Sequence, residues 1–199
     1  RNEMYKANAE RTRFAARFES YSDYLLSLNM TAEIEPFSSV YLPRITQLTN
    51  KSNQFNLTTK RYTQNEIEEI SRNRGYIHLY GRLEDKFGDN GVVSVIIGKI
   101  EGGDLHIDLW LMSCRVLKRD MEYAMLDSLV EKCREKNIKN IYGYYYKTKK
   151  NSMVSGLYKQ FGFIELYENE KGDSKWLLDI SVYKNKNNVI LVKEREETK

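Results

Sequence analysis

Residues 105–136 read LHIDLWLMSCRVLKRDMEYAMLDSLVEKCREK, and this stretch decides the fold class. Its first part, residues 105–112, is mostly apolar and follows the Gly102-Gly103 turn, which predicts a strand. Its last part, residues 119–136, repeats apolar residues every three or four positions and predicts a long amphipathic helix. The apolar face of this helix comprises Met121, Ala124, Met125, Leu129, Val130 and Cys133. A central strand that enters a long helix through a short turn is therefore expected at the heart of the domain.

The sequence around this unit predicts an alternation of strands and helices. Residues 76–86 have the period of two that is typical of a strand, and residues 92–100 are almost all apolar, as in a strand covered on both faces. Between them, Asn90-Gly91 predicts the turn of a hairpin. Thr63 with Glu66 predicts a capping box that starts a helix over 64–73. Further strands are expected at 32–36, 138–146, 163–167 and 176–182, and further helices after Pro43 and after Asn151.

The domain organisation follows from changes in composition. Residues 1–30 read as charged helices with a thin apolar stripe, which predicts a helical linker. Residues 31–183 carry the regular elements and are expected to form one domain. Residues 184–199 read as a polar tail, in which the apolar run 189–192 predicts an added edge strand. The chain begins at Arg1 rather than Met, so we expect it to be a piece of a longer protein.

Composition excludes several classes of protein. The chain of 199 residues is 41% hydrophobic, which is too much for a disordered chain, and no apolar run approaches the roughly 20 residues that span a membrane. Lys and Arg total 32 against 28 Asp and Glu, a balance that does not indicate nucleic acid as a partner. Two cysteines cannot form a disulfide framework, so we expect a reducing cytoplasm. His78 and His106 lack metal-ligand spacing, so no metal site is expected.

The order of the elements resembles the GNAT acyltransferase fold, an α/β (α+β) fold with a mixed, mainly antiparallel, splayed sheet flanked by helices. In GNAT proteins a Q/R-x-x-G-x-G/A turn precedes the long helix, and its amides hold the pyrophosphate of acetyl-CoA. The resemblance assigns this cofactor role to Arg115, Val116, Leu117, Lys118, Arg119 and Asp120, and also to Asn151 at the start of the later helix. Tyr158 before Gly162-Phe163 matches the GNAT tyrosine that protonates the departing thiolate.

Three runs of residues also resemble a narrower family, the FkbH-like proteins. They are Arg44–Tyr62, Asp85–Gly91 and Met112–Leu117. FkbH-like proteins join a haloacid-dehalogenase-type phosphatase domain to a GNAT-like domain. The family is associated with loading a glyceryl unit onto an acyl carrier protein for methoxymalonyl-type extender units. The resemblance implies that an upstream phosphatase domain and an acyl carrier protein are partners of this chain.

Lys118 and Asp120 replace both glycines of the GNAT turn, and this change bears on the cofactor. Glycine permits positive φ and close approach of the backbone to phosphate. Asp120 places a carboxylate at the helix N-terminus, where it would compete with a bound anion, while Lys118 and Arg119 would grip one phosphate from the side. This pattern favours the phosphopantetheine of a carrier protein over free coenzyme A or acetyl-CoA, or no thioester cofactor at all. The competing interpretation is that Asp120 simply caps a core helix.

Cys114 and Tyr158 are the candidate catalytic residues. Cys114 is expected at a strand end beside the helix N-terminus and next to Arg115, an environment that favours a thiolate able to carry an acyl group. The alternative for Cys114 is a small buried residue. The alternative for Tyr158 is a core aromatic residue on a helix face.

A polar loop is the candidate site for a hydroxylated acyl group, because amides and hydroxyls both donate and accept hydrogen bonds. Its residues are Asn53, Gln54, Asn56, Thr58 and Thr59. Phe55 and Leu57 predict that the loop is packed and ordered, although the same composition is common in ordinary loops. The run Lys147–Lys150 is either a solvated loop or a docking patch for an acidic carrier protein.

Three functions therefore stay open at this point. The first is an acyltransferase-type module of an FkbH-like enzyme that acts on a carrier-linked thioester. The second is a CoA-dependent N-acetyltransferase, which would need a usable cofactor turn. The third is a non-catalytic domain that only docks the carrier protein.

Overall fold

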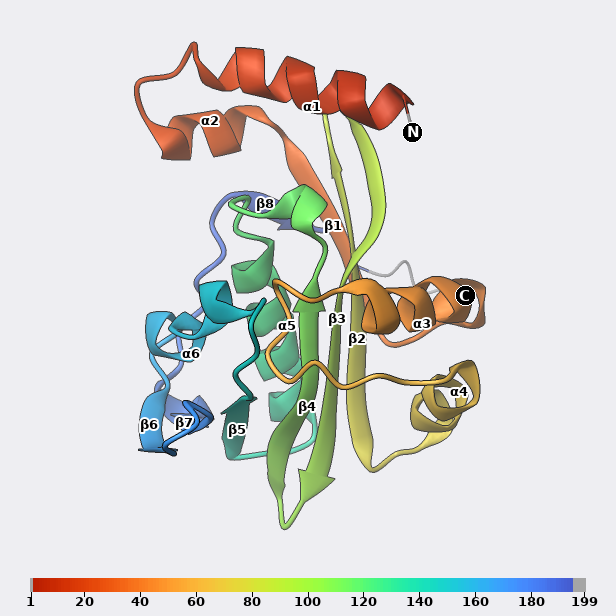
Figure 1. Ribbon diagram of the computed structural model, residues 1–199, viewed down its shortest axis with the longest axis vertical. Helices are drawn as coiled ribbons and strands as arrows, with labels where there is room; N and C mark the ends of the chain where they lie inside the picture. Colours follow the sequence, from red (N-terminus) through yellow and green to blue (C-terminus); the bar gives the residue numbers. More distant parts are fainter. Residues whose placement is uncertain (1, 195–199) are drawn as a thin grey trace.

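The strands of the computed structural model, which describes residues 2–194, form one mixed sheet with helices on both faces (Figure 1). The sheet order is β6-β7-β5-β4-β3-β2-β1-β8. The strands are β1 (Met30–Glu35), β2 (Tyr76–Asp85), β3 (Gly88–Glu101), β4 (Asp104–Met112), β5 (Asn140–Tyr145), β6 (Ile164–Glu168), β7 (Ser174–Asp179) and β8 (Ile190–Val192). Only the β4–β5 and β1–β8 pairs are parallel. The predicted mixed, mainly antiparallel sheet is thus confirmed, and residues 195–199 of the polar tail lie outside the described residues.

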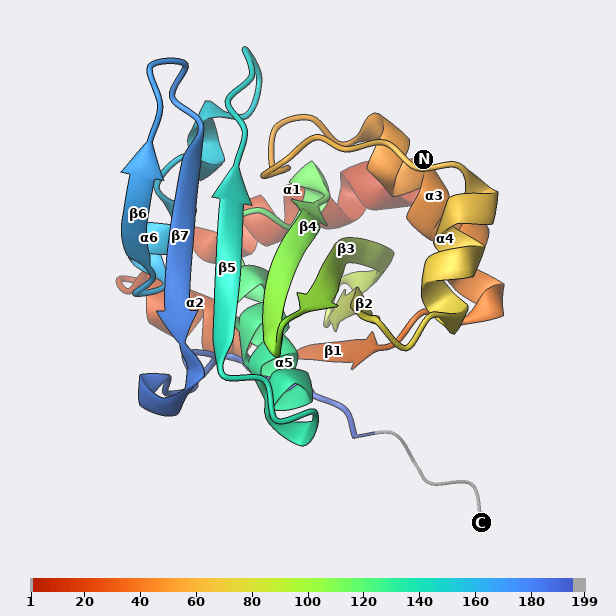
Figure 2. The ribbon, with the colours of Figure 1, turned by 90° about the horizontal axis from the view of Figure 1, so that it is seen from below.

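The helices cover the two faces of the sheet in separate groups (Figure 2). They are α1 (Asn2–Ala15), α2 (Tyr21–Ser27), α3 (Leu42–Lys51), α4 (Gln64–Arg72), α5 (Met121–Glu135) and α6 (Leu157–Gln160), with short 3-10 turns η1 (Ser39–Tyr41), η2 (Cys114–Val116), η3 (Ser152–Val154) and η4 (Ile180–Val182). Helices α5 and α6 pack on one face, whereas α3 and α4 pack on the other. Strand β3 sends Val93 and Ile96 to the first group and Val95 and Ile97 to the second, so it is covered on both faces as predicted.

The helix signals in the sequence hold in the structure. All six apolar residues predicted for the inner face of α5 are fully buried. Burying a side chain of this size contributes about 1.5–3 kcal/mol, so this face alone fixes α5 against the sheet. Thr63 and Glu66 form the predicted capping box at the start of α4.

The predicted hairpin of β2 and β3 is confirmed, but its turn does not lie at Asn90-Gly91. Strands β2 and β3 pair as far as Asp85 and Gly88, so the turn lies at Lys86-Phe87. Gly91 has φ of 66° and sits inside β3, where the register with β2 shifts. A glycine with positive φ suits a β-bulge as well as a turn, so the dipeptide alone did not distinguish the two.

Strands β4 and β5 pair at one end only, which leaves a space between their other ends. Leu105 pairs with Ile141 and His106 with Tyr142, and the strands then diverge. We call the space between the diverging parts, residues 107–112 of β4 and 143–145 of β5, the wedge. Its open end faces the turn that enters α5.

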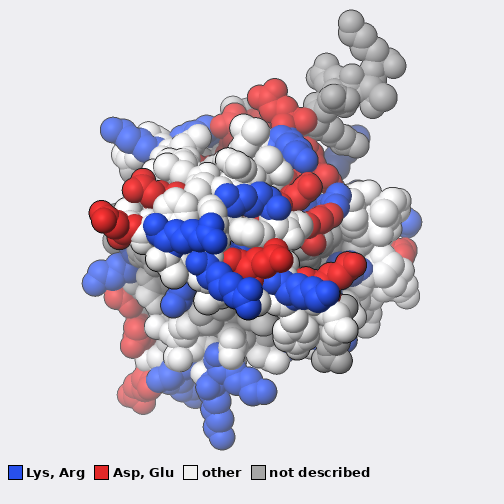
Figure 3. All heavy atoms as spheres, turned by 90° about the horizontal axis from the view of Figure 1, so that it is seen from above, with Lys and Arg blue, Asp and Glu red and all other residues white. Residues whose placement is uncertain are grey.

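Helix α1 is fixed to the domain by buried charges. The Arg11 guanidinium donates to both carboxylate oxygens of Asp85, at 2.7 and 2.9 Å, and Arg119 Nη1 lies 3.3 Å from Asp85 Oδ2. The three side chains are almost fully buried. The predicted helical segment before residue 31 therefore packs on the end of β2 and on the turn before α5. Its outer face, seen in Figure 3, mixes acidic and basic side chains without a patch of one sign.

None of the helices in residues 2–194 has the length and apolar character of a membrane span.

The buried cluster predicts a large loss of stability on neutralising Asp85. Asp85→Asn leaves two buried guanidinium groups without a carboxylate, and we expect the free energy of unfolding to fall by about 3 kcal/mol. For a chain of this length the melting temperature should fall by roughly 6–12 °C. Lys132→Ala is the control, because it breaks only the exposed pair with Glu135 and should cost less than about 1 kcal/mol. Equal losses for the two variants in urea unfolding would contradict a structural role for the cluster.

Candidate functional site

The turn that enters α5 has a left-handed backbone at both positions where the GNAT pattern has glycine. Lys118 has φ of 63° and Asp120 has φ of 61°, so both glycine positions of the GNAT pattern are left-handed in this chain. A residue other than glycine in this conformation costs roughly 1 kcal/mol. The turn therefore has a backbone that favours glycine at two positions that carry side chains. The tyrosine hydroxyl of Tyr21, on α2, donates to the Lys118 carbonyl and holds the turn from outside.

Only part of the predicted cofactor turn faces solvent. Arg115 and Lys118 are exposed, whereas Val116 is buried in the core and Leu117 packs against it. Arg119 is buried, and its Nη2 donates to the Arg115 carbonyl at 2.7 Å while its Nη1 faces Asp85. The expectation that Arg119 grips a phosphate from the side is wrong, because its guanidinium is committed to these internal acceptors.

Two carboxylates lie at the N-terminus of α5. Asp120 occupies the N-cap position, but its side chain makes no capping hydrogen bond, so the expectation that it caps the helix is wrong. Burial raises the pKa of Asp120. Glu122 is half-buried, and its Oε2 has no hydrogen-bond partner within residues 2–194. Its pKa is raised, mainly by burial and further by the charge of Asp120. These charges oppose an anion at the helix terminus.

The wedge is filled by the chain itself. The segment Phe55–Leu57, from the loop between α3 and α4, lies against β4 like an added strand: Leu57 N donates to Trp110 O and Met112 N donates to Phe55 O, both at 3.0 Å. On the other side, Tyr146 N donates to Leu57 O at 2.9 Å. Figure 2 shows this loop reaching the ends of β4 and β5. These bonds occupy the Trp110 carbonyl and the Met112 amide on the wedge side of β4, so an arm that binds along this part of β4 would have to displace Phe55–Leu57.

Asn151 ties this segment to β5. Its Nδ2 donates to Asn56 O at 3.0 Å and to Tyr146 O at 2.9 Å, and its Oδ1 accepts from Thr148 N at 2.8 Å and from the Tyr145 hydroxyl at 3.2 Å. Asn151 precedes η3, but its side chain makes no capping bond to that turn. The amide is fully buried and all of its usual hydrogen-bonding capacity is used within the protein.

Tyr158 is fully buried on α6 beneath β5. Tyr144 N donates to its hydroxyl at 3.2 Å, and the hydroxyl lies 3.3 Å from Tyr144 O. A Cβ on Gly143 would come within 2.4 Å of the Tyr158 ring, so glycine is required there. Burial raises the pKa of Tyr158 far above the ordinary tyrosine value. Any proton donation by this hydroxyl needs the wedge to open first.

Cys114 differs from the other candidates because it is exposed. It starts η2 directly after β4, and the exposed Arg115 and Lys118 follow it in the turn. The alternative of a small buried residue at a strand end is therefore wrong for Cys114. Cys133, in contrast, is buried on α5, and burial raises its pKa to about 12.

The amide-rich loop is ordered mainly by its own contacts. Asn56 is buried, donates to Ser52 O and accepts from Thr59 N, while Thr58 donates to Asp108 O. Asn53 accepts from Arg61, Thr59 has φ of 55°, and Gln54 is exposed. Burial of Phe55 and Leu57 confirms the predicted packed loop. Of the five proposed acyl-binding residues, Gln54 is the one whose side chain reaches solvent most freely.

Sequence reasoning missed Glu122 and the strand-like role of Phe55–Leu57. A carboxylate in the first turn of a helix looks like an ordinary dipole partner, and its burial depends on the packing of the turn. The apolar residues flanking Asn56 were the available signal for the second feature. No cluster of three or more potential metal ligands occurs in residues 2–194.

Comparison with solved structures identifies the fold. The chain superposes on ribosomal-protein-S18-alanine N-acetyltransferase from Escherichia coli with a TM-score of 0.56 and 12% identity, over 79% of this chain and 99% of that one. It superposes on PaiA N-acetyltransferase from Thermoplasma acidophilum, solved with coenzyme A, with a TM-score of 0.54 and 17% identity over 75% and 99%. For spermidine N-acetyltransferase from Vibrio cholerae, solved with coenzyme A and spermine, the values are 0.57 and 13% over 76% and 96%.

The chain therefore has the GNAT acetyltransferase fold, as the order of its elements predicted. Comparison of the sequence with protein-family models and with curated proteins finds no match.

The contacts of Asn151 predict its effect on the wedge. Asn151→Ala removes four hydrogen bonds from a buried position, so we expect the free energy of unfolding to fall by about 3 kcal/mol. Hydrogen exchange should accelerate at the amides of Leu57 and Tyr146 more than elsewhere. Asn185→Ala, at an exposed position, should cost less than about 0.5 kcal/mol. Unchanged exchange at Leu57 would show that Asn151 does not hold the segment.

The burial of Glu122 predicts a pH effect. Because its pKa is raised in the folded state, the ionised carboxylate lowers stability as pH rises above the ordinary glutamate value of about 4.3. Glu122→Gln should therefore raise the free energy of unfolding at pH 7 and leave it nearly unchanged at pH 3.5. The control is Glu165→Gln on the exposed strand β6. Parallel pH profiles for wild type and Glu122→Gln in urea unfolding would refute the assignment.

Proposed function

We propose that this chain is the acyltransferase-type domain of an FkbH-like enzyme, which transfers a glyceryl-type unit to the phosphopantetheine thiol of an acyl carrier protein. The observation that carries the proposal is the exposed thiol of Cys114 at the mouth of a turn that has kept its left-handed path. The resemblance of three separate runs to FkbH-like proteins supplies the substrate class.

The charges of the turn favour a carrier-bound arm over free coenzyme A. Coenzyme A brings a diphosphate and a further 3′-phosphate, whereas the arm of a carrier protein brings one phosphodiester. Asp120 and Glu122 oppose a highly charged ligand at the α5 terminus, while the exposed Arg115 and Lys118 suit a single charge. A CoA-dependent N-acetyltransferase is therefore the less favoured assignment.

Transfer through Cys114 proceeds in two balanced steps. The Cys114 thiolate attacks the carbonyl of a phosphoglycerate donor whose carboxyl group is activated as an acyl phosphate; a C–S bond forms, the C–O bond breaks, and inorganic phosphate leaves with the electron pair. The carrier thiolate then attacks this thioester, the new C–S bond forms, and Cys114 leaves as thiolate. Both steps take place at an exposed residue, so neither requires the wedge to open. Tyr158 has no part in this route.

The filled wedge supports a second candidate, a domain that docks the carrier protein without chemistry. Freeing Phe55–Leu57 from β4 and β5 breaks four backbone-linked hydrogen bonds, of about 1 kcal/mol each, and exposes two buried apolar side chains of about 2 kcal/mol each. Spontaneous opening should then involve on the order of one molecule in a million. Thioester chemistry inside the wedge is correspondingly disfavoured.

Intact mass distinguishes these functions. The full enzyme, with its phosphatase domain, is incubated with a phosphoglycerate donor and carrier protein, and the acylation of each component is followed. We expect transient acylation of the enzyme and stable acylation of the carrier, both lost in Cys114→Ser. Cys133→Ser is the matched control and should retain them.

Each competing function has its own result in this experiment. Carrier binding with full transfer by Cys114→Ser identifies a docking domain. Low-micromolar binding of acetyl-CoA to this chain, with acetylation of an amine, identifies an N-acetyltransferase and overturns the proposal.

A further inference from the structure

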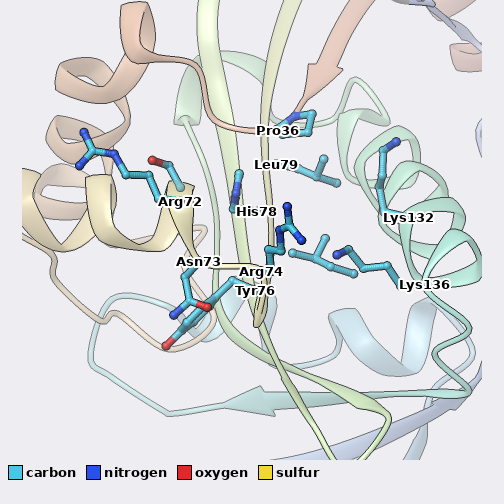
Figure 4. A pocket seen from close by; sticks show the side chains of 11 residues that line it. Pro36, Arg72, Asn73, Arg74, Tyr76, His78, Leu79, Lys132 and Lys136 are labelled. Atoms are coloured by element: carbon cyan, nitrogen blue, oxygen red, sulfur yellow. The ribbon is translucent and has the colours of Figure 1, made fainter.

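A basic pocket lies at the opposite end of α5 from the turn (Figure 4). It has a volume of about 230 Å³ and is formed by the end of α4, the start of β2 and the last turn of α5. Its cationic side chains are Arg72, Arg74, Lys132 and Lys136. Because α5 rises about 1.5 Å per residue, this pocket is roughly 20 Å from Asp120 and is separate from the proposed acyl site.

Two of the four cations that line the pocket are not balanced by carboxylates. No Asp or Glu is among the lining residues. Arg72 lies 3.9 Å from Glu68, and Lys132 lies 2.9 Å from Glu135, both on the outer surfaces of their helices. Arg74 and Lys136 form no ion pair within residues 2–194. Figure 4 shows these two side chains reaching into the pocket from opposite sides.

The floor of the pocket adds neutral polar groups. Phe37 N donates to His78 Nδ1 at 2.9 Å, so the neutral ring carries its proton on Nε2. Burial lowers the pKa of His78, as does the charge of Lys136. The side-chain Oδ1 of Asn73 accepts from Gly75 N at 2.8 Å, which leaves the side-chain Nδ2 of Asn73 as a donor. The His78 ring also hydrogen-bonds the Ser71 backbone, so the groups left for a ligand are the cations and the side-chain amide of Asn73.

We propose that this pocket binds a small anion with two or more negative charges, of the phosphate-monoester class. Paired Arg and Lys groups with N–H donors are the usual partners of such an anion. The volume is below the roughly 300–1,000 Å³ of pockets for drug-sized ligands, so the pocket suits a phosphate group and a short attached chain rather than a nucleotide.

The same cations could instead protect an open strand edge, and the test must distinguish that role from anion binding. Strand β1 pairs with β2 only from Tyr80 to Glu84, so Tyr76–Leu79 form an open edge at the pocket. Positive side chains beside an open edge hinder pairing with other strands. That function requires positive charge but no saturable anion site.

The test titrates the ¹⁵N-labelled chain with inorganic phosphate and measures the NMR chemical shifts of its backbone amides. We expect saturable shifts at Asn73, Gly75 and Tyr76, which sodium chloride at matched ionic strength does not reproduce. Arg74→Gln and Lys136→Gln should each weaken binding by about tenfold, as expected for one lost charge-assisted contact. Lys171→Gln, in the exposed β6–β7 turn, is the matched control and should bind as wild type.

Several outcomes would overturn the proposal. Shifts that chloride reproduces, or that persist unchanged in Arg74→Gln with Lys136→Gln, mean that no anion site exists. Tighter binding of an oligoglutamate peptide than of phosphate, with shifts along Tyr76–Leu79, means that the open edge binds an acidic strand instead. Aggregation of the two Gln variants without any phosphate binding by wild type supports edge protection alone.

Discussion

The structure depends on how the peptide groups of two diverging strands are satisfied. Strands β4 and β5 separate after His106 and Tyr142, and a buried N–H or C=O without a partner costs about 1–3 kcal/mol. In this chain, Phe55–Leu57 supplies the missing partners on both sides. The same bonds complete the sheet, order the loop between α3 and α4, and close the wedge. A change that opened the wedge would therefore also lower the stability of the fold.

The turn before α5 is shaped by a second constraint, which acts from outside the sheet. Asp85 holds Arg119 within the core and Arg11 on α1, so the N-terminal helix and the turn share one buried carboxylate. Tyr21 adds a contact to Lys118 from α2. The unfavourable left-handed backbone at Lys118 and Asp120 is maintained by this surrounding structure. The turn is therefore left-handed at the two positions where the GNAT pattern has glycine, although neither residue is glycine.

The sequence predicted those features that depend on local pattern. The spacing of Met121, Ala124 and Met125 predicted the buried face of α5, and Thr63 with Glu66 predicted the start of α4. Features that depend on distant partners were beyond reach. The burial of Arg119 requires Arg11 and Asp85, and the pairing of Phe55–Leu57 requires β4. The bulge at Gly91 was mistaken for a turn because positive φ serves both. At the site, Cys114 is exposed and Tyr158 is buried. The local sequence pattern does not predict this difference.

Asn151 also has an evolutionary consequence. Its amide joins Asn56, which lies 95 residues away in the chain, to the nearby Tyr146 and Thr148. Substitutions at residues that share one hydrogen-bond network are not additive, so these positions should show epistasis. A descendant that opened the wedge could not reach that state through one tolerated step at Asn151. Residues Phe55–Leu57 and Asn151 would have to change together, so relatives with a closed wedge and relatives with an open wedge should differ at both places at once.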